Sequence, residues 1–169
     1  MAHLDYILHL ADSAIVLGQR NAEWCGHGPI LEEDIAMANN SLDLIGQARM
    51  LYQYAATLKG GDATEDSLAY FRDAQEFRNY TLLELPHHGA LVGYAVDNRD
   101  YAVTIVRNFL YSAFMALVWE SCKPHTTNTW LRLRPSHSKR CATTCVTHTI
   151  GWFALATAPQ NRTPAHKQR

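Results

Sequence analysis

Apolar residues recur every three or four positions through the first part of the chain, at Ile7, Leu10, Ala14 and Leu17, and Trp24 continues the series. The polar residues between them are expected on the other faces of a helix: His9, Asp12, Ser13, Gln19 and Arg20. This pattern predicts an amphipathic helix over about residues 5–24. The glycines and the proline of CGHGP, directly after it, are typical of a helix end.

A second and longer helix is predicted for the segment LEEDIAMANNSLDLIGQARMLYQYAATLKGG, which begins at residue 31. Three acidic residues at positions 32–34 lie in its first turn, where carboxylates interact favourably with the positive end of the helix dipole. The apolar residues expected to form one stripe are Ile35, Ala38, Leu42, Ile45 and Leu51. The pair Gly60 and Gly61 ends this helix after roughly seven turns or more.

Two further helical regions follow. One is predicted from about Thr64 to Leu85, where Pro86 stops it, and the other from about Asp100 to Glu120. The last region is apolar on nearly every face, so we expect it to be buried among neighbours or against a partner. The segment PHHGALVGYAVDNR between them is predicted to be a loop. Long helices without an alternating strand pattern indicate an all-α bundle.

Composition adds little to this picture, since 47% apolar residues is ordinary for one globular domain. We expect no signal peptide, because Asp5 and Asp12 interrupt the start of the chain before an apolar run forms. No stretch approaches the roughly 18 uncharged apolar residues of a membrane span. The sequence therefore predicts a cytoplasmic protein with free cysteines and no membrane partner.

The charge distribution divides the chain near Glu120. All 16 Asp and Glu residues lie at or before Glu120, while residues 121–169 hold no acid and are rich in Lys, Arg, Thr, Pro and Cys. Such a tail is either a basic arm for nucleic acid or membrane, or not native coding sequence.

Helical bundles often carry di-iron sites, in which a Glu-x-x-His motif places two ligands on one face of a helix. The one such motif here is Glu84 to His87, and Pro86 inside it disrupts the helical spacing. On the second helix an acid, Asp43, is followed three residues later by Gly46 rather than by a histidine. The sequence therefore predicts that a di-iron ligand set is missing.

Two other groups have a functional and a structural interpretation. Asp73 and Glu76, beside Arg72 and Arg78, are remnants of a carboxylate site or, as we favour, ordinary helix ion pairs. The stretch EWCGHG holds three candidate metal or thiol residues: Glu23, Cys25 and His27. A helix-ending turn with a packed Trp24 is the favoured interpretation. The chain has no glycine-rich phosphate loop and no serine nucleophile motif.

The tail stretch HSKRCATTCVTH contains four residues that resemble zinc ligands: His137, Cys141, Cys145 and His148. Together with the basic tail they define an alternative function, a small zinc or nucleic-acid binding protein. Its weakness is the spacing, since structural zinc sites usually separate two close pairs by a loop.

Three stretches carry a resemblance to a known family: LGQRNAEWCGHGPILEEDIAMANNSLDLIGQARMLYQYA, LAYFRDAQEFRNYTLLELP and DYAVTIVRNFLYSAFMALVWE. In this order they resemble the C component of the ring 1,2-phenylacetyl-CoA epoxidase, the multicomponent oxygenase of phenylacetate breakdown. The resemblance covers about residues 4–120, and the combination of EWCGHGP, LDLIGQAR and FRN is specific.

The resemblance implies a ferritin-like helical bundle without catalysis of its own. In that family the di-iron centre belongs to the catalytic subunit, the A component, which binds phenylacetyl-CoA and inserts one oxygen atom into the ring. The C component pairs with the catalytic subunit, which it keeps stable and soluble. The resemblance thus implies a structural subunit with no catalytic, cofactor-binding or metal-binding residue and no nucleic-acid partner.

Besides the structural subunit and the zinc or nucleic-acid binding protein, a third hypothesis is an independent di-iron oxygenase.

The resemblance and the acids stop together at Glu120, which indicates a shifted reading frame. Codons for KRCATTCVTHT, read one base earlier, can encode EVRYHVRHTH, and synonymous codons extend this to a helical peptide that resembles the family's continuation. We therefore expect a ferritin-like helical region over residues 1–120, with later helices of the bundle missing. Residues 121–169 are expected to be an out-of-frame tail without a fold of its own, in which the zinc-like spacing is accidental.

Overall fold

The structure is a computed structural model that describes residues 2–87 and 100–121. The candidate zinc ligands His137, Cys141, Cys145 and His148 lie outside the described residues, as does the tail beyond Ser121. Five α-helices and one 3-10 turn form the described part, which contains no strand. They are α1 (Ala2–Ala22), α2 (Leu31–Lys59), α3 (Glu65–Tyr70), the 3-10 turn η1 (Ala74–Glu76), α4 (Thr81–Glu84) and α5 (Tyr101–Ser121). The all-α fold is confirmed, and it is consistent with the ferritin-like bundle that the resemblance implies.

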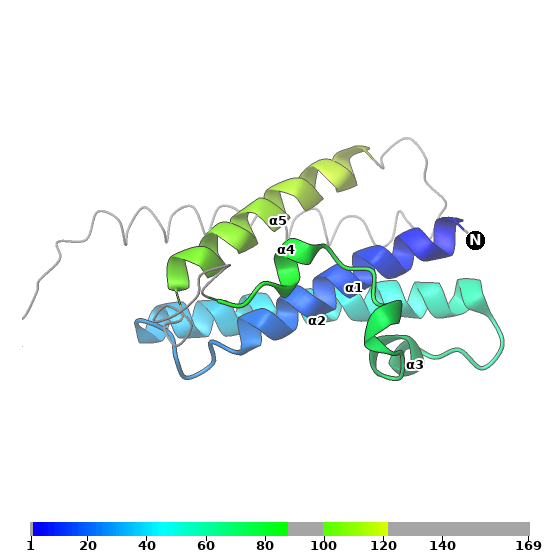
Figure 1. Ribbon diagram of the computed structural model, residues 1–169, viewed down its shortest axis with the longest axis horizontal. Coiled ribbons are helices and arrows are strands. Elements are labelled where there is room, and N and C mark those ends of the chain that lie inside the picture. The colour runs from blue at the N-terminus through cyan, green and yellow to red at the C-terminus, as the bar shows by residue number, and fades with distance from the viewer. Residues whose placement is uncertain (1, 88–99, 122–169) are drawn as a thin grey trace, which may run out of the picture.

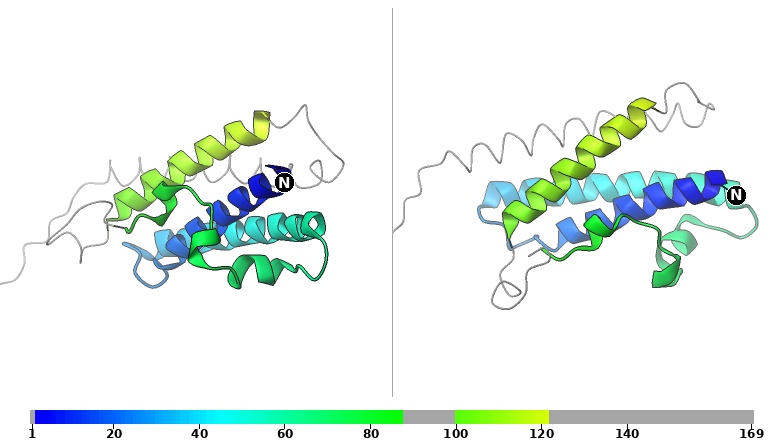
Figure 2. Two further views of the ribbon diagram at one scale, coloured as in Figure 1. Left: turned by 45° about the vertical axis from the view of Figure 1, so that its right-hand side comes forward. Right: turned by 45° about the horizontal axis from the view of Figure 1, so that its top comes forward.

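Helices α1 and α2 form an antiparallel pair, and α5 crosses over this pair at an angle (Figures 1 and 2). The short elements α3, η1 and α4 run back along α1, from the end of α2 toward the start of α5 (Figure 1). The first two helices approach closely at Gly18, where a Cβ atom would lie 3.1 Å from the Ile45 side chain. Ser41 of α2 donates a hydrogen bond to the Gly18 carbonyl oxygen at the same place.

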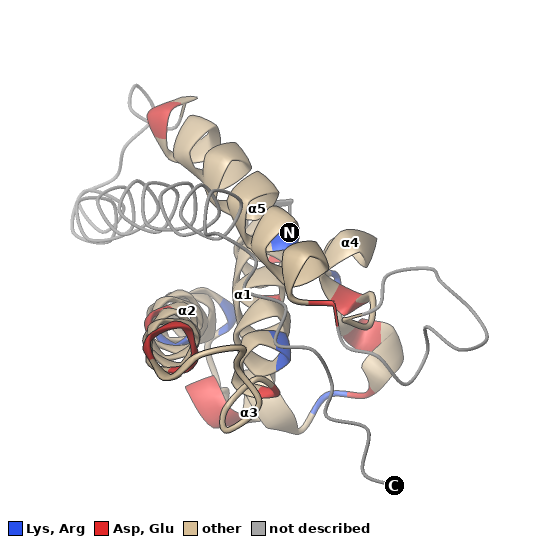
Figure 3. Ribbon diagram, turned by 90° about the vertical axis from the view of Figure 1, so that its left-hand side faces the viewer, with Lys and Arg blue, Asp and Glu red and all other residues tan. Residues whose placement is uncertain are grey.

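The predicted first helix is confirmed, and its apolar stripe is buried at all four positions from Ile7 to Leu17. Trp24, in the turn after α1, is buried as well. The expectation for two polar residues is wrong, because Asp12 and Ser13 are fully buried rather than on an outer face. Helix α1 lies between α2, the α3–α4 segment and α5, so its middle turns have almost no face left for solvent (Figure 3).

The second helix has the predicted extent but a different buried face. Ile35 and Leu42 of the predicted stripe are 54% and 69% exposed, and only Leu51 is fully buried. The observed face repeats every three or four residues and is formed by Met37, Ser41, Leu44, Gln47, Ala48, Leu51, Tyr52 and Ala55. Two polar residues, Ser41 and Gln47, weaken its apolar signal. The predicted stripe is therefore exposed at Ile35 and Leu42 but reaches the core at Ile45 and Leu51.

The third predicted helix, over residues 64–85, is wrong as a single element. The chain leaves α3 at Phe71, forms η1 and starts α4 only at Thr81. The helix breaks here because the Arg72 side chain and the Arg78 backbone N–H both donate hydrogen bonds to the buried Asp12 carboxylate. A continuous helix would use the Arg78 N–H in its own hydrogen-bond ladder.

The last helix, α5, has the predicted extent. Arg107 is the one charged residue between Tyr101 and Trp119, so by length and composition α5 is the one described helix that could cross a membrane, a test that core helices also pass. Its buried side chains include Thr104, Arg107 and Asn108, which bond to other elements of the protein. The expected burial among neighbours is met on this side, whereas several large apolar side chains on the outer side are exposed.

The buried face of α2 predicts that shortening a buried side chain costs more stability than shortening an exposed one two residues away. Leu44→Ala should lower the free energy of unfolding by about 3 kcal/mol, because it leaves a cavity against α1. Leu42→Ala, two residues away on the exposed side, should change it by less than about 0.5 kcal/mol. Urea unfolding followed by circular dichroism measures both values. Equal losses would contradict the observed register of α2.

Candidate functional site

The first candidate site is a buried carboxylate, Asp12, at the centre of the described structure. The Tyr52 hydroxyl of α2 donates a hydrogen bond of 2.6 Å to Oδ1. The Arg72 guanidinium forms an ion pair with the same carboxylate and a 3.2 Å bond to Oδ2. The Arg78 backbone N–H donates a third bond to Oδ2 at 3.0 Å. Both oxygens of Asp12 are therefore occupied by donors from three parts of the chain.

The electrostatics of this cluster are those of a closed structural site. Burial and the hydrogen bond to Asp12 raise the pKa of the Tyr52 hydroxyl well above its usual value, so it remains a donor. Burial alone would lower the pKa of Arg72, but the bond and charge of Asp12 outweigh it and raise that pKa. The Arg72 guanidinium also stacks over the Phe77 ring at 4.4 Å, which orients it further.

A second polar cluster joins the end of α1 to α5 through His87. The Trp24 indole donates to His87 Nδ1 at 3.1 Å and to the Thr104 hydroxyl at 3.0 Å. Arg107 also points an N–H group at His87 Nδ1, again at 3.1 Å. Because two N–H groups point at Nδ1, this nitrogen accepts hydrogen bonds and Nε2 carries the ring proton. His87 Nε2 lies 3.1 Å from a Glu23 carboxylate oxygen, within ion-pair range.

Amide and guanidinium groups complete this second cluster. The buried side chains of Asn21 in α1 and Asn108 in α5 exchange two hydrogen bonds, of 2.7 and 2.9 Å. Arg107 donates to the Leu85 carbonyl oxygen, while its buried Nε has no partner among the described residues. Burial and the nearby charge of Arg20 lower the pKa of Arg107, and Glu23 partly offsets them. The cluster fixes α5 to α1 with few charges.

The Glu-x-x-His motif is not a ligand pair in the structure. Glu84 lies exposed at the end of α4 and accepts a 2.9 Å bond from the Asn79 amide. His87 lies buried beyond Pro86, beside Trp24. The turn after α1 agrees with the favoured interpretation, because Trp24 is packed while Cys25 and His27 are exposed.

The acids of the third predicted helix have another role than helix ion pairs. Asp73 and Glu76 form a capping box around η1, in which the Asp73 backbone N–H donates to Glu76 at 2.9 Å. Arg72 pairs with Asp12 instead of either acid, so the predicted ion pairs are wrong. Asp43 lies half-buried on α2, and Gly46 takes the place one helical turn later where a histidine ligand would be needed.

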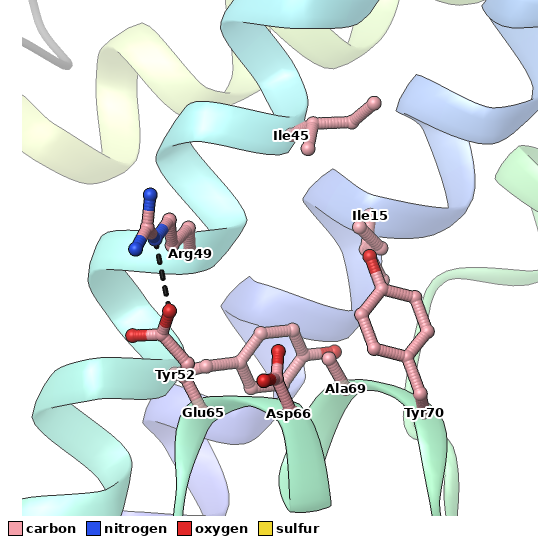
Figure 4. Close-up of a pocket in the computed structure, with 8 residues that line it drawn as sticks. All are labelled: Ile15, Ile45, Arg49, Tyr52, Glu65, Asp66, Ala69 and Tyr70. Carbon is pink, nitrogen blue, oxygen red and sulfur yellow. Dashed lines mark hydrogen bonds and ion pairs between the residues drawn. The ribbon is translucent and has the colours of Figure 1, made fainter.

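An open pocket of about 300 Å³ lies between α1, α2 and α3 (Figure 4). The Tyr52 ring forms part of its wall, while its hydroxyl is used by Asp12. Arg49 and Glu65 form a 2.9 Å ion pair at the rim, and Arg49 is 68% exposed. The pocket is thus lined by this surface ion pair, the Asp66 carboxylate and the rings of Tyr52 and Tyr70.

The described residues do not fit a di-iron centre. No group of three or more His, Cys, Asp or Glu residues in residues 2–87 and 100–121 is placed to hold a metal ion. Asp12, the one buried acid among them, has both oxygens occupied by donors. A carboxylate in this state has no free lone pairs directed at a metal.

Several of the residues that build these clusters escaped sequence reasoning. Asp12 lies between apolar positions 10, 11, 14 and 15, so the local density of apolar residues was a usable signal of burial. The apolar residues around Thr104, Arg107 and Asn108 gave a similar signal in α5. Nothing in the sequence showed which of these polar groups would meet across helices.

Comparison with known proteins gives two findings. The model of a family described as phenylacetic acid catabolic protein matches residues 1–134. The C component of 1,2-phenylacetyl-CoA epoxidase from Escherichia coli (strain K12) is 45% identical over 109 residues, which are 64% of this chain and 39% of that relative. The chain thus spans about two fifths of the length of this relative. The family match continues past Glu120, where the sequence pattern had placed the end of the resemblance.

Removing the buried carboxylate should cost far more than removing a surface charge. Asp12→Asn leaves the Arg72 cation buried without its partner, so the free energy of unfolding should fall by about 3–5 kcal/mol. Arg49→Gln, which breaks the exposed pair with Glu65, should cost less than about 1 kcal/mol. Chemical unfolding measures both. In an Asp12→Asn, Arg72→Met double variant, part of the loss should return.

The raised pKa of Tyr52 predicts a loss of stability at alkaline pH. Above about pH 10 the unfolded chain releases this proton while the folded chain keeps it, so unfolding becomes easier as pH rises. Tyr52→Phe should reduce this slope by about 1.4 kcal/mol per pH unit. Urea unfolding at several values above pH 10 tests this, with Leu42→Ala as the control that removes no titrating group. An unchanged slope in Tyr52→Phe would contradict the assignment.

Proposed function

The chain belongs to the phenylacetic acid catabolic protein family, and on this basis we propose that it is a structural, non-catalytic subunit of a phenylacetyl-CoA epoxidase. Its role would be to bind and stabilise the catalytic subunit, the A component, which would carry the di-iron centre and oxidise the ring. The protein would act in the cytoplasm, in aerobic phenylacetate breakdown.

One structural observation carries the non-catalytic part of this proposal. The buried acid of the described helices, Asp12, is used to hold the fold together. The second cluster is likewise built from hydrogen bonds among Trp24, His87 and Thr104 and between Asn21 and Asn108, which join the end of α1 to α5. Polar groups that are engaged with one another support a scaffold role, because they have little capacity left for substrate or metal.

The 45% identity to the C component of an epoxidase supports the choice of complex. This identity favours the epoxidase subunit over the zinc or nucleic-acid binding protein. The candidate zinc ligands of that alternative lie outside the described residues. A second observation favours the structural subunit over an independent oxygenase: the described residues hold no group of side chains placed to bind a metal ion.

Co-expression with the catalytic subunit tests the proposal. A tagged form of this chain should co-purify with that partner and increase the amount of it that stays soluble. Asp12→Asn, which destabilises the fold, should lose this effect, whereas the surface variant Arg49→Gln should keep it. The purified chain alone should contain no stoichiometric iron. Stoichiometric iron with oxygen consumption in the absence of the catalytic partner would refute the structural role.

We also propose that the family-like domain ends near residue 120 and that residues 121–169 are read from a shifted frame. The change in composition at Glu120 supports this boundary, although the family match extends to residue 134. Sequencing of the coding DNA around the codons for Glu120 and Ser121 is the test. Restoring one base should open a longer frame, and an intact frame in independent reads with no continuation in the shifted frame would refute the proposal.

A further inference from the structure

The His87 ring of the second cluster holds three parts of the chain together. It is 4% exposed and contacts Trp24 in the turn after α1 and both Thr104 and Arg107 in α5. The Trp24 ring meets it edge-to-face, with ring centroids 5.1 Å apart. The Asp100 backbone N–H donates to the His87 carbonyl oxygen at 3.3 Å, which ties the start of α5 to the same residue. A histidine in this position can couple the packing of these parts to pH.

The Nδ1 nitrogen of this ring is surrounded by donors. The Trp24 indole and the Arg107 guanidinium each point an N–H group at it from 3.1 Å, and neither group can accept a hydrogen bond. The Thr104 hydroxyl lies 2.9 Å from Nδ1 and accepts a bond from the Trp24 indole, so its own proton is free to point at Nδ1. A proton on Nδ1 would face two N–H groups at hydrogen-bond distance, and both of these bonds would be lost.

The charges beside the ring also disfavour a second ring proton. Arg107 is a cation in contact with Nδ1. Glu23 lies 3.1 Å from Nε2, but its other oxygen is paired with Arg20 at 2.8 Å and its side chain is 40% exposed. Burial and the charge of Arg20 lower the pKa of Arg107, and Glu23 offsets them only in part. The surroundings of Arg107, which are also those of His87, are therefore unfavourable to positive charge.

Three further acids in the described elements around this cluster are bonded to other groups. Glu33 of α2 accepts a 2.7 Å bond from the Tyr101 hydroxyl. Glu84 of α4 accepts a 2.9 Å bond from the Asn79 amide. The Asp100 carboxylate accepts a 2.9 Å bond from the Ala102 backbone N–H. Glu23, shared with Arg20, is thus the carboxylate that the structure places against the His87 ring.

From this geometry we propose that His87 is an acid-sensitive switch, whose protonation on Nδ1 separates α5 from the turn after α1. The neutral ring accepts the bonds from Trp24 and Arg107, and the charged ring cannot. Once α5 has separated, the ring takes up a proton like an ordinary histidine, at about pH 6.5. The contact is therefore strongest above that pH and weakens as the pH falls, by up to about tenfold in its equilibrium constant per pH unit. This inference does not rest on the proposed function.

NMR titration of the unmodified full chain, with nitrogen-15 in its histidines, tests the protonation directly. At about pH 7.5 the His87 ring should carry its proton on Nε2 and none on Nδ1. As the pH is lowered, the His87 ring should become protonated about one pH unit or more below the exposed His27 ring. A proton on Nδ1 at neutral pH, or protonation of His87 at the same pH as His27 or above it, would overturn the proposal.

Amide hydrogen exchange of the full chain tests the separation of α5. Between about pH 7.5 and pH 5.5, and after correction for the pH dependence of exchange itself, protection of the α5 amides should fall about tenfold or more. Protection in the middle of α1 and α2 should change less. His87→Gln, which stays neutral and keeps an acceptor oxygen, should remove this dependence, whereas the matched control His27→Gln should keep it. The same loss in both variants, or an equal loss in α1, α2 and α5, would contradict the switch.

Discussion

The burial of Asp12 is the constraint on which the described structure depends. A carboxylate without solvent exposure costs several kcal/mol unless donors surround it, and this one draws its donors from separate parts of the chain. Tyr52 sets the register of α2 against α1, since its hydroxyl must reach Oδ1. The contacts of Arg72 and of the Arg78 backbone with Asp12 set the path of the chain after α3, where the helix is interrupted. One acid thus fixes the relative positions of three segments.

The same interaction limits what the helices can do chemically. Carboxylate sites in helical bundles bind metals through lone pairs that point into the bundle, with hydrogen-bonding partners that orient them. In this chain the partners, Arg72 and Tyr52, occupy the oxygens themselves. The second cluster follows the same principle, because Asn21 and Asn108 satisfy each other and His87 is held between donors. A bundle of this kind gains a defined geometry from its polar groups, which is what a structural subunit would need.

The extents of the long helices were predictable because apolar spacing and glycine or proline breaks are local signals. The interruption of the predicted helix over residues 64–85 was not predictable, because it depends on the bond between Arg72 and Asp12, which lies sixty residues earlier in the chain. The face of α2 was misjudged for a related reason. Ser41 and Gln47 lie on its buried side, while Ile35 and Leu42 lie on the exposed side, so hydropathy alone favoured the wrong stripe. For the candidate site, sequence reasoning could weigh local ligand motifs but not the polar clusters, whose partners are defined only by the packing of the helices.

Helix α5 is held against the rest of the described structure by polar and apolar side chains on its inner side. Arg107 must stay inside because it donates to the Leu85 carbonyl oxygen and to His87, and both acceptors lie in the segment that leads away from α4. Thr104 and Asn108 lie one turn apart on the same inner side and bond to Trp24 and Asn21. Large apolar side chains of α5 are buried beside these polar groups as well: Ile105, Tyr111, Met115 and Trp119. The position of α5 on α1 is therefore fixed by these hydrogen bonds together with the burial of Tyr111, Met115 and Trp119 in the hydrophobic core.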